Sequence, residues 1–282
     1  MYVTMKTKPI SAPVKRPRNL QDKLQKLINH SLNTNAFSTF PYITQQLNSK
    51  QSIKNTQSGN CVALSLYLKL QLKKLYDIDS YLIPATVPSY IYKEGYLTIC
   101  HVALLVPLSN TTYFLIDPAF YFMEPLKITT NRPIEPSKCM DIYNDTPKYV
   151  NAHLKSLDKR VQLNEYQGLP KNTMGCECAY THNLEDTWTY YMREIMNPDQ
   201  SISQFFIKIR KEPFFVSTRM VGDICKKELV IRTHSTNHIS IKYMDDTIYD
   251  GPLFTIHPQI KKAVQELLSY RNFDKSILDL HF

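Results

Sequence analysis

The chain has 282 residues, of which 43% are hydrophobic and 21% charged, and its formal net charge is +9. This composition excludes a disordered protein, and the length suffices for one large domain or two closely packed ones. No apolar run approaches the roughly 20 residues of a membrane-spanning helix, and the first residues lack the apolar stretch of a signal peptide. We therefore expect an intracellular, cytoplasmic protein that makes no contact with a membrane.

Residues 1–18 are predicted to form a basic, flexible tail. Its positive charges are Lys6, Lys8, Lys15, Arg16 and Arg18. Clustered Lys and Arg can bind nucleic-acid phosphates, and the run KRPR has the composition of a nuclear signal. The other positive charges are scattered among acidic residues. A solvated tail is therefore the preferred interpretation, with nucleic-acid binding and a nuclear location as the alternatives.

Residues 19–80 are predicted to form a helical segment. Its first helix should begin after Asn19, a residue type that commonly caps helices, because apolar residues then recur at helical spacing. These apolar residues are Leu20, Leu24, Leu27 and Ile28. Residues 33–60 are polar and predict a loop, with one short helix over residues 42–47.

A second helix is predicted to begin at Cys61, within the sequence SGNCVALSLYLKLQLKKL. Its apolar stripe consists of Cys61, Leu64, Leu68, Leu72 and Leu75, and its polar side carries Lys69, Lys73 and Lys74.

Residues 81–250 are predicted to form a β-rich core. SYLIPATV, CHVALLVPL and TYFLIDPAF read as strands, and the last two make a hairpin with Ser109 and Asn110 in its turn. Residues 128–183 are rich in Pro and Asn and predict a long connection with short elements. Further strands are predicted at SQFFIKIR, FFVSTRM, KELVIRTH and HISIKYM, and residues 251–282 form a helical segment with an amphipathic helix at HPQIKKAVQELLSY.

These elements predict the α/β (α+β) fold class. We expect an N-terminal helical segment, a catalytic helix packed on an antiparallel sheet or barrel, a β-rich second half and a C-terminal helix.

Three residues have the chemistry of a cysteine nucleophile and its partners. Cys61 lies at a helix start, where the helix dipole and unpaired N–H groups favour an anion. His101 begins one strand of the hairpin and Asp117 ends the other, so both fall at the same end of the hairpin. A thiolate, a base and a group that orients the base are what nucleophilic catalysis by cysteine requires. We therefore predict a Cys61, His101 and Asp117 triad.

The triad makes a prediction about the register of the hairpin. Facing residues of an antiparallel pair have a constant sum of residue numbers, which is 218 if His101 lies directly opposite Asp117. An even sum requires a loop with an odd number of residues, either Leu108 to Asn110 or five residues centred on Ser109. A two-residue loop would place the two side chains on opposite faces.

The other cysteines predict neither disulfides nor a metal site. Six cysteines at irregular spacing are expected to be free thiols. Cys176, Cys178 and His182 lack a clear fourth ligand, so no metal is expected. Cys100 directly precedes His101 and is expected to point to the opposite side of the strand, with no assigned role.

The blocks GNCVALSLYLKL, HVALLV and YFLIDPAF, within residues 58–122, resemble the catalytic blocks of the arylamine N-acetyltransferase family in the wider transglutaminase-like, papain-like superfamily. The chain length, the helical start and the β-rich second half also suit that family. The resemblance implies a Cys61, His101 and Asp117 triad that takes an acetyl group from acetyl-coenzyme A and passes it to a small-molecule amine.

The residues around the triad differ from that family in two places. Gln57, Ser58, Gly59 and Asn60 precede Cys61 in place of an Arg-Gly-Gly-type run, and Pro118, Ala119 and Phe120 follow Asp117 in place of glycines. The Asp-Pro pattern is closer to transglutaminase-like proteins. A transglutaminase-like amidase or cysteine peptidase acting on an acyl or peptide substrate is therefore the alternative enzyme. A non-enzymatic basic binding protein that retains the fold is the alternative outside the enzymes.

Residues near the triad complete the predicted site. The backbone N–H of Cys61 and one side chain, Asn55 or Gln57, are the candidates for holding the oxyanion. The candidates for lining the substrate pocket are Asn60, Pro118 and Phe120.

Overall fold

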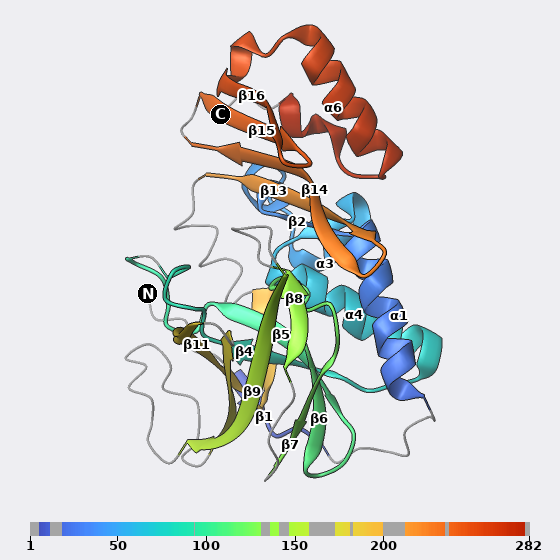
Figure 1. The fold of residues 1–282 in the computed structure, drawn as a ribbon, viewed down its shortest axis with the longest axis vertical. Helices are drawn as coiled ribbons and strands as arrows, with labels where there is room; N and C mark the ends of the chain where they lie inside the picture. The colour runs from blue at the N-terminus through green and yellow to red at the C-terminus, as the bar shows by residue number, and fades with distance from the viewer. Residues whose placement is uncertain are drawn as a thin grey trace.

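The computed structural model describes most of the chain. The described residues are 6–11, 19–92, 94–130, 136–140, 147–157, 173–180, 183–199, 212–234 and 237–279. The protein has the expected mixed architecture, in which helices pack on antiparallel sheets and the second half is mostly β (Figure 1). No helix among these residues is long and apolar enough to cross a membrane.

The helices are α1 Leu20–Thr34, α2 Phe40–Thr44, α3 Ser49–Thr56, α4 Cys61–Tyr76 and α6 Pro258–Tyr270, with 3-10 turns at Leu253–Thr255 and Lys275–Leu278. The first eight strands are β1 Lys6–Lys8, β2 Ala36–Ser38, β3 Ser58–Gly59, β4 Tyr81–Ala85, β5 His101–Pro107, β6 Thr112–Ile116, β7 Leu126–Thr129 and β8 Ser137–Met140. The remaining strands are β9 Pro147–Leu157, β10 Thr173–Tyr180, β11 Asn183–Tyr191, β12 Glu194–Met196, β13 Phe214–Val221, β14 Ile224–Thr233, β15 His238–Tyr243 and β16 Asp246–Pro252.

An eight-stranded antiparallel sheet forms a nearly closed barrel. Its strand order is β7-β6-β5-β4-β11-β10-β9-β8, and a bridge between Phe122 and Cys139 links the segment before β7 to β8. Because side chains alternate along a strand, one face of β5 fills the barrel and the other packs against α4. Ala103 and Leu105 lie in the barrel core, whereas Val102 and Leu104 share a core with the helices.

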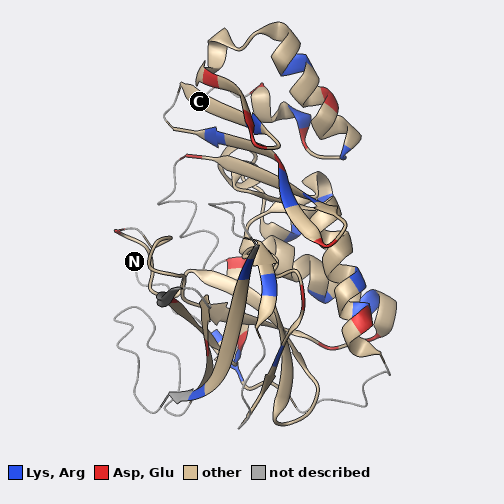
Figure 2. Ribbon diagram, in the orientation of Figure 1, with Lys and Arg blue, Asp and Glu red and all other residues tan. Residues whose placement is uncertain are grey.

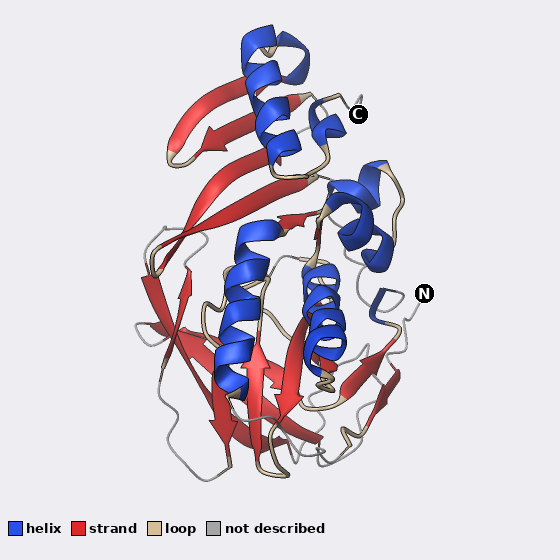
Figure 3. Ribbon diagram, turned by 90° about the vertical axis from the view of Figure 1, so that its right-hand side faces the viewer, coloured by secondary structure: helices blue, strands red, loops and turns tan. Residues whose placement is uncertain are grey.

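A second sheet lies at the C-terminal end of the molecule. Its strand order is β16-β15-β14-β13-β2-β3, so two short strands from the helical segment join the sheet made by the last strands. Figure 3 shows α6 running along this sheet, with α1 and α4 side by side against the barrel. The apolar face of α6, including Val264 and Leu268, packs against Phe215 and Ile231 of the sheet.

The N-terminal segment differs from the predicted tail. Residues 6–8 form β1, which pairs antiparallel with β12, and Lys8 forms an ion pair with Glu194 at 2.9 Å. Residues 1–5 and 12–18 lie outside the described residues. Figure 2 shows Lys and Arg interspersed with Asp and Glu over the described helices and sheets.

Helices α1 and α4 were predicted correctly, with two local differences. Asn19 precedes α1 in a left-handed conformation (φ 61°) and its side chain makes no capping hydrogen bond. Leu75 of α4 is 54% exposed, because the apolar stripe leaves the core at the last turn of the helix. The other four members of that stripe are buried.

Two predicted connections were wrong. Residues 33–60 contain β2, α3 and β3 besides α2, and α3 begins with a capping box made by Asn48 and Gln51. Residues 128–183 contain the strands β8, β9 and β10. FFVSTRM, KELVIRTH, HISIKYM and the C-terminal helix are confirmed, whereas SQFFIKIR lies outside the described residues.

Candidate active site

The start of α4 is fixed by a buried polar network. The side-chain oxygen of Asn60 accepts hydrogen bonds from the backbone N–H groups of Val62 (3.1 Å) and Ala63 (3.3 Å), which caps the helix. The hydroxyl of Tyr42 donates to the same oxygen at 2.9 Å and accepts from the backbone N–H of Asn60 at 3.1 Å. This network holds Cys61, which is 8% exposed, at the first turn of the helix.

Gly59 lies beside this network, and its lack of a side chain is required there. Atoms of neighbouring residues already fill the space that a Cβ atom would occupy. A Cβ atom at Gly59 would lie 2.4 Å from Cβ of Ala63, 2.9 Å from the hydroxyl of Tyr42 and 3.1 Å from Oγ of Ser52. A side chain at this position would therefore displace the first turn of α4.

The substitution Gly59→Ala is expected to lower the free energy of unfolding by about 1–3 kcal/mol, the cost of overpacking a filled core, and to slow alkylation of Cys61. Gly222→Ala is the control. Its Cβ would meet no atom within 4 Å, but its φ of +61° costs about 1 kcal/mol for alanine. It should therefore destabilise the protein without changing Cys61. Urea unfolding and iodoacetamide labelling measure the two effects, and wild-type values for both in Gly59→Ala would contradict the proposed role.

In the β5–β6 hairpin the numbers of facing residues have an even sum, as predicted, but the centre of the turn is shifted by one residue. Leu104 faces Ile116 and Pro107 faces Tyr113, so facing residues add to 220 rather than to 218. The backbone N–H of Leu108 donates to the carbonyl of Thr112, which centres the turn on Asn110 rather than on Ser109. The sum stays even, so both side chains keep the same face.

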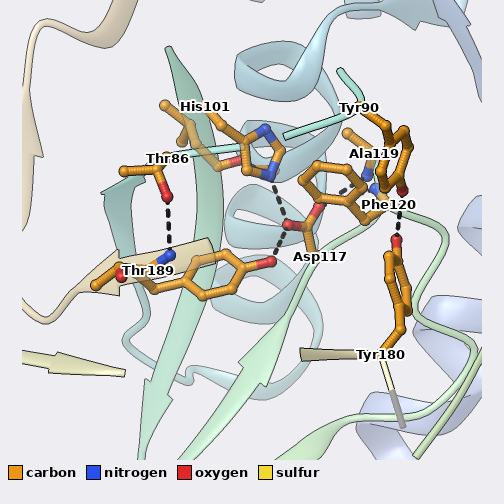
Figure 4. A network of polar contacts seen from close by, with 11 residues as sticks. Thr86, Tyr90, His101, Asp117, Ala119, Phe120, Tyr180 and Thr189 are labelled. Carbon is orange, nitrogen blue, oxygen red and sulfur yellow. Dashed lines mark hydrogen bonds and ion pairs between the residues drawn. The ribbon is translucent and has the colours of Figure 1, made fainter. Parts of the chain in front are cut away.

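The shifted register places His101 and Asp117 diagonally rather than directly opposite. Diagonal neighbours on one face of a sheet remain within reach of long side chains. Nε2 of His101 lies 2.5 Å from Oδ2 of Asp117, and both side chains are almost fully buried (Figure 4).

Asp117 accepts hydrogen bonds at both carboxylate oxygens. The backbone N–H groups of Ala119 and Phe120 donate to Oδ1 at 3.1 and 3.0 Å, as Figure 4 shows. The hydroxyl of Tyr190 donates to Oδ2 at 2.6 Å, beside the His101 contact. These donors compensate the cost of burying the carboxylate, and they fix its direction toward the imidazole.

Tyr190 was not predicted from the sequence. It lies on β11, where it faces Ala85 of β4, and Ala85 faces His101 of β5. The three residues therefore stand side by side across neighbouring strands.

The surroundings of the His101 ring favour its charged form. Burial by itself lowers the pKa of His101, but the charge and hydrogen bond of Asp117 and the interaction with Cys61 outweigh it and raise the pKa to about 10. Because Nε2 points to Asp117, the other ring nitrogen is the one left for the thiol. A pKa raised above its unfolded value stabilises the fold below about pH 6.5, and this contribution is lost as the pH rises through about 10.

Aromatic side chains surround the histidine. The ring of Phe120 makes an edge contact with His101 at a centroid distance of 4.6 Å, and Trp188 lies 5.4 Å beyond Phe120. Tyr180 continues the row at 5.0 Å from Trp188. The candidate pocket residues Pro118 and Phe120 are both buried, and Phe120 belongs to the barrel core.

The other sequence candidates lie on the segment that leads into α4. Asn60 is buried, and its side chain caps the helix as described above. Gln57 is half-buried with a left-handed backbone at the end of α3, whereas Asn55 is exposed on α3.

The remaining cysteines are buried and reduced. Cys176 and Cys178 lie on the same face of β10 in the barrel core with their sulfur atoms 4.0 Å apart, and His182 lies outside the described residues. Among the residues that the structure describes, no group of three or more His, Cys, Asp or Glu side chains could hold a metal ion. Cys100 points to the opposite side of the strand from His101, as predicted, and this side faces α4. Cys100 shares the core beside α4 with Cys61, whose charge contributes, after burial, to a raised pKa of Cys100.

Searches with the sequence find no matching family model and no matching curated protein. Solved structures do match over nearly the whole chain. The arylamine N-acetyltransferase from Salmonella typhimurium is 11% identical with a TM-score of 0.54, and the alignment covers 94% of this chain and 87% of that one. The enzyme from M. smegmatis is 10% identical with a TM-score of 0.54 and coverages of 92% and 88%.

A third match is the arylamine N-acetyltransferase from Bacillus cereus, with 11% identity, a TM-score of 0.53 and coverages of 88% and 90%. This chain has the fold of the arylamine N-acetyltransferases. At these identities the similarity shows an N-acetyltransferase-like fold, which confirms the resemblance seen in the catalytic blocks. Structures of that fold have been described with a Cys-His-Glu triad, in the Bacillus cereus enzyme, and in complex with CoA, in the Mycobacterium marinum enzyme.

Proposed function

We propose that this protein is a thiol-dependent acyltransferase, similar to the arylamine N-acetyltransferases, that works through a covalent acyl-cysteine at Cys61. The observation that carries the proposal is the buried contact of 2.5 Å between His101 and Asp117 next to a cysteine at a helix start. Its support from the fold is the match along nearly the whole length of acetyltransferase structures.

In this mechanism the sulfur of Cys61 attacks the carbonyl carbon of the acyl donor. The charged His101 gives its proton to the leaving group, which departs and leaves a thioester on Cys61. The neutral His101 then takes a proton from the amine that attacks the thioester. The C–S bond breaks, the sulfur of Cys61 leaves, and the acyl group is released as an amide. Asp117, held by Tyr190, keeps Nε2 of His101 in place throughout and stabilises the imidazolium.

The oxyanion of each step needs two donors. The backbone N–H of Cys61 at the first position of α4 supplies one, because the first N–H groups of a helix have no partner within it. Asn55 and Gln57 are the proposed sources of the second donor, with Gln57 the more enclosed of the two.

The resemblance implies acetyl-coenzyme A as the acyl donor, but the residues after Asp117 do not favour it. Pro118 and Phe120 are buried, and the Phe120 ring packs against His101 at 4.6 Å. The side chains of Pro118 and Phe120 therefore fill the space beside Asp117 that small residues would leave open. We propose a small activated acyl donor and a small-molecule amine acceptor, with no step that depends on coenzyme A.

Mass spectrometry of the intact protein tests both parts of the proposal. After incubation with p-nitrophenyl acetate, one acetyl group is expected on Cys61, and transfer of that group to an added aromatic amine should restore the free thiol. After incubation with acetyl-coenzyme A, little or no acetyl group is expected. Cys61→Ala is the control and should remain unmodified with both reagents.

Three results would change this proposal. An acetyl group on Cys61 from acetyl-coenzyme A would contradict the argument that Pro118 and Phe120 exclude the coenzyme, and it would support the full acetyltransferase activity. An adduct that is released only to water would support the amidase or peptidase alternative. If neither reagent modifies Cys61, the protein is the non-enzymatic alternative that retains the fold.

A further inference from the structure

Cys100 lies in the core on the side of β5 that faces α4. It directly precedes β5, and alternate residues after it, Val102 and Leu104, belong to the same core. Cys61 and Leu64 of α4 belong to that core as well. Both cysteines therefore belong to the core that contains the contact between α4 and β5.

A hydrogen bond sets the position of α4 along β5. Oγ of Ser65 donates to the backbone carbonyl of Val102 at 3.2 Å. Cys61 lies four residues before Ser65, a step of about 6 Å along a helix. Cys100 lies two residues before Val102, a step of about 6.6 Å along a strand.

From the hydrogen bond between Ser65 and Val102, the step back to Cys61 and the step back to Cys100 run in the same direction. His101 at the start of β5 interacts with Cys61 at the start of α4, so the helix and the strand begin side by side. The geometry therefore brings the thiol of Cys100 next to that of Cys61, on the α4 side of His101. Cys100 is 4% exposed, and burial, with a smaller contribution from the charge of Cys61, raises its pKa to about 12.

We propose that Cys61 and Cys100 form a reversible disulfide when Cys61 is oxidised by a hydroperoxide. The Cys61 thiolate attacks one peroxide oxygen, the O–O bond breaks, and the sulfur becomes a sulfenic acid while the peroxide is reduced to an alcohol or water. The sulfur of Cys100 then attacks the sulfur of Cys61. The S–O bond breaks, and the hydroxyl leaves with the Cys100 proton as water.

The proposed disulfide has a clear consequence for the site. It removes the Cys61 thiol from acyl transfer, and it prevents further oxidation of the sulfenic acid to the irreversible sulfinic acid. Reduction by a dithiol restores both cysteines. The proposal requires an oxidisable thiol at Cys61 and does not depend on acyl transfer.

The test is oxidation of the wild-type protein with a small excess of hydrogen peroxide, followed by peptide mapping. A linked peptide pair that contains Cys61 and Cys100 is expected, and dithiothreitol should separate it. In Cys100→Ala the linked pair should be missing and Cys61 should accumulate as sulfinic acid, so at least about tenfold less thiol should be recovered by dithiothreitol. Cys225→Ala, which removes another buried cysteine, should behave like the wild type.

The mapping of wild-type protein needs no variant, so a folding defect in Cys100→Ala leaves the test intact. The proposal is overturned if Cys61 is oxidised but the linked pair does not form, or if Cys100→Ala recovers as much Cys61 thiol as the wild type. Formation of the disulfide in a protein that takes no acyl group would contradict the proposed function while this inference stands.

Discussion

The substitution Asp117→Asn is expected to reduce acyl transfer through Cys61 by about a thousand- to ten-thousand-fold, the scale of loss when a triad loses its orienting carboxylate. An amide has no charge to stabilise the His101 imidazolium, and its NH₂ group would face the donors of His101 and Tyr190. The measurement is kcat/KM for transfer from p-nitrophenyl acetate to an amine, together with thermal unfolding to show that the variant is folded.

Tyr190→Phe is the matched control for this experiment. It removes one hydrogen bond of 2.6 Å to the same oxygen of Asp117 and leaves the charge and the His101 contact in place. A hydrogen bond to a charged group contributes about 1.5–3 kcal/mol, so the expected loss is about ten- to a hundredfold. Equal losses in the two folded variants, or full activity in Asp117→Asn, would contradict the assigned role of the carboxylate.

The elements that carry the proposed triad could be predicted because their signals are local. The apolar stripe of α4 and the two strands of the hairpin each lie within about twenty residues of sequence, and periodicity is the strongest signal over such lengths. An odd number of loop residues gives facing residues an even sum, and this parity puts His101 and Asp117 on the same face. The value of the register could not be predicted, because it depends on whether the turn centres on Ser109 or Asn110, and both are turn-forming residues.

The other side of the site could not be predicted because it depends on pairing between distant strands. Tyr190 reaches Asp117 only because β11 pairs with β4, and these strands are about one hundred residues apart in the chain. Residues 128–183 also show no alternation that would mark β9 and β10 as strands. These strands are buried because they pair with distant strands of the barrel, and such long-range contacts leave no local pattern in the sequence.

The position of Cys100 shows a limit of reasoning by alternation alone. Alternation correctly separates Cys100 from His101 on opposite faces of the chain. It does not show which face meets α4, and the hydrogen bond between Ser65 and Val102 supplies that information. The strand end therefore presents His101 toward Asp117 on one face and Cys100 toward the core that contains Cys61 on the other.

Cys61 is expected to react with iodoacetamide at about pH 6 at least a hundredfold faster than the other cysteines, because only a thiolate is a good nucleophile. Exposure does not explain such a difference, since Cys61, Cys100 and Cys225 are 8%, 4% and 5% exposed. Burial raises the pKa of Cys100 and of Cys225 to about 12, and at pH 6 only about one molecule in a million would carry a thiolate there. Cys61 instead lies at a helix start beside a charged histidine.

The pH profile of this reaction gives a sharper test than one rate. The pKa of His101 is about 10, so the imidazolium stays beside Cys61 through the neutral range. The advantage of Cys61 over Cys100 and Cys225 in labelling rate should therefore persist through the neutral range. His101→Gln should remove the advantage, and all six cysteines should react alike in urea. The nucleophile assignment fails if Cys61 in the folded protein reacts no faster than Cys139 or Cys225.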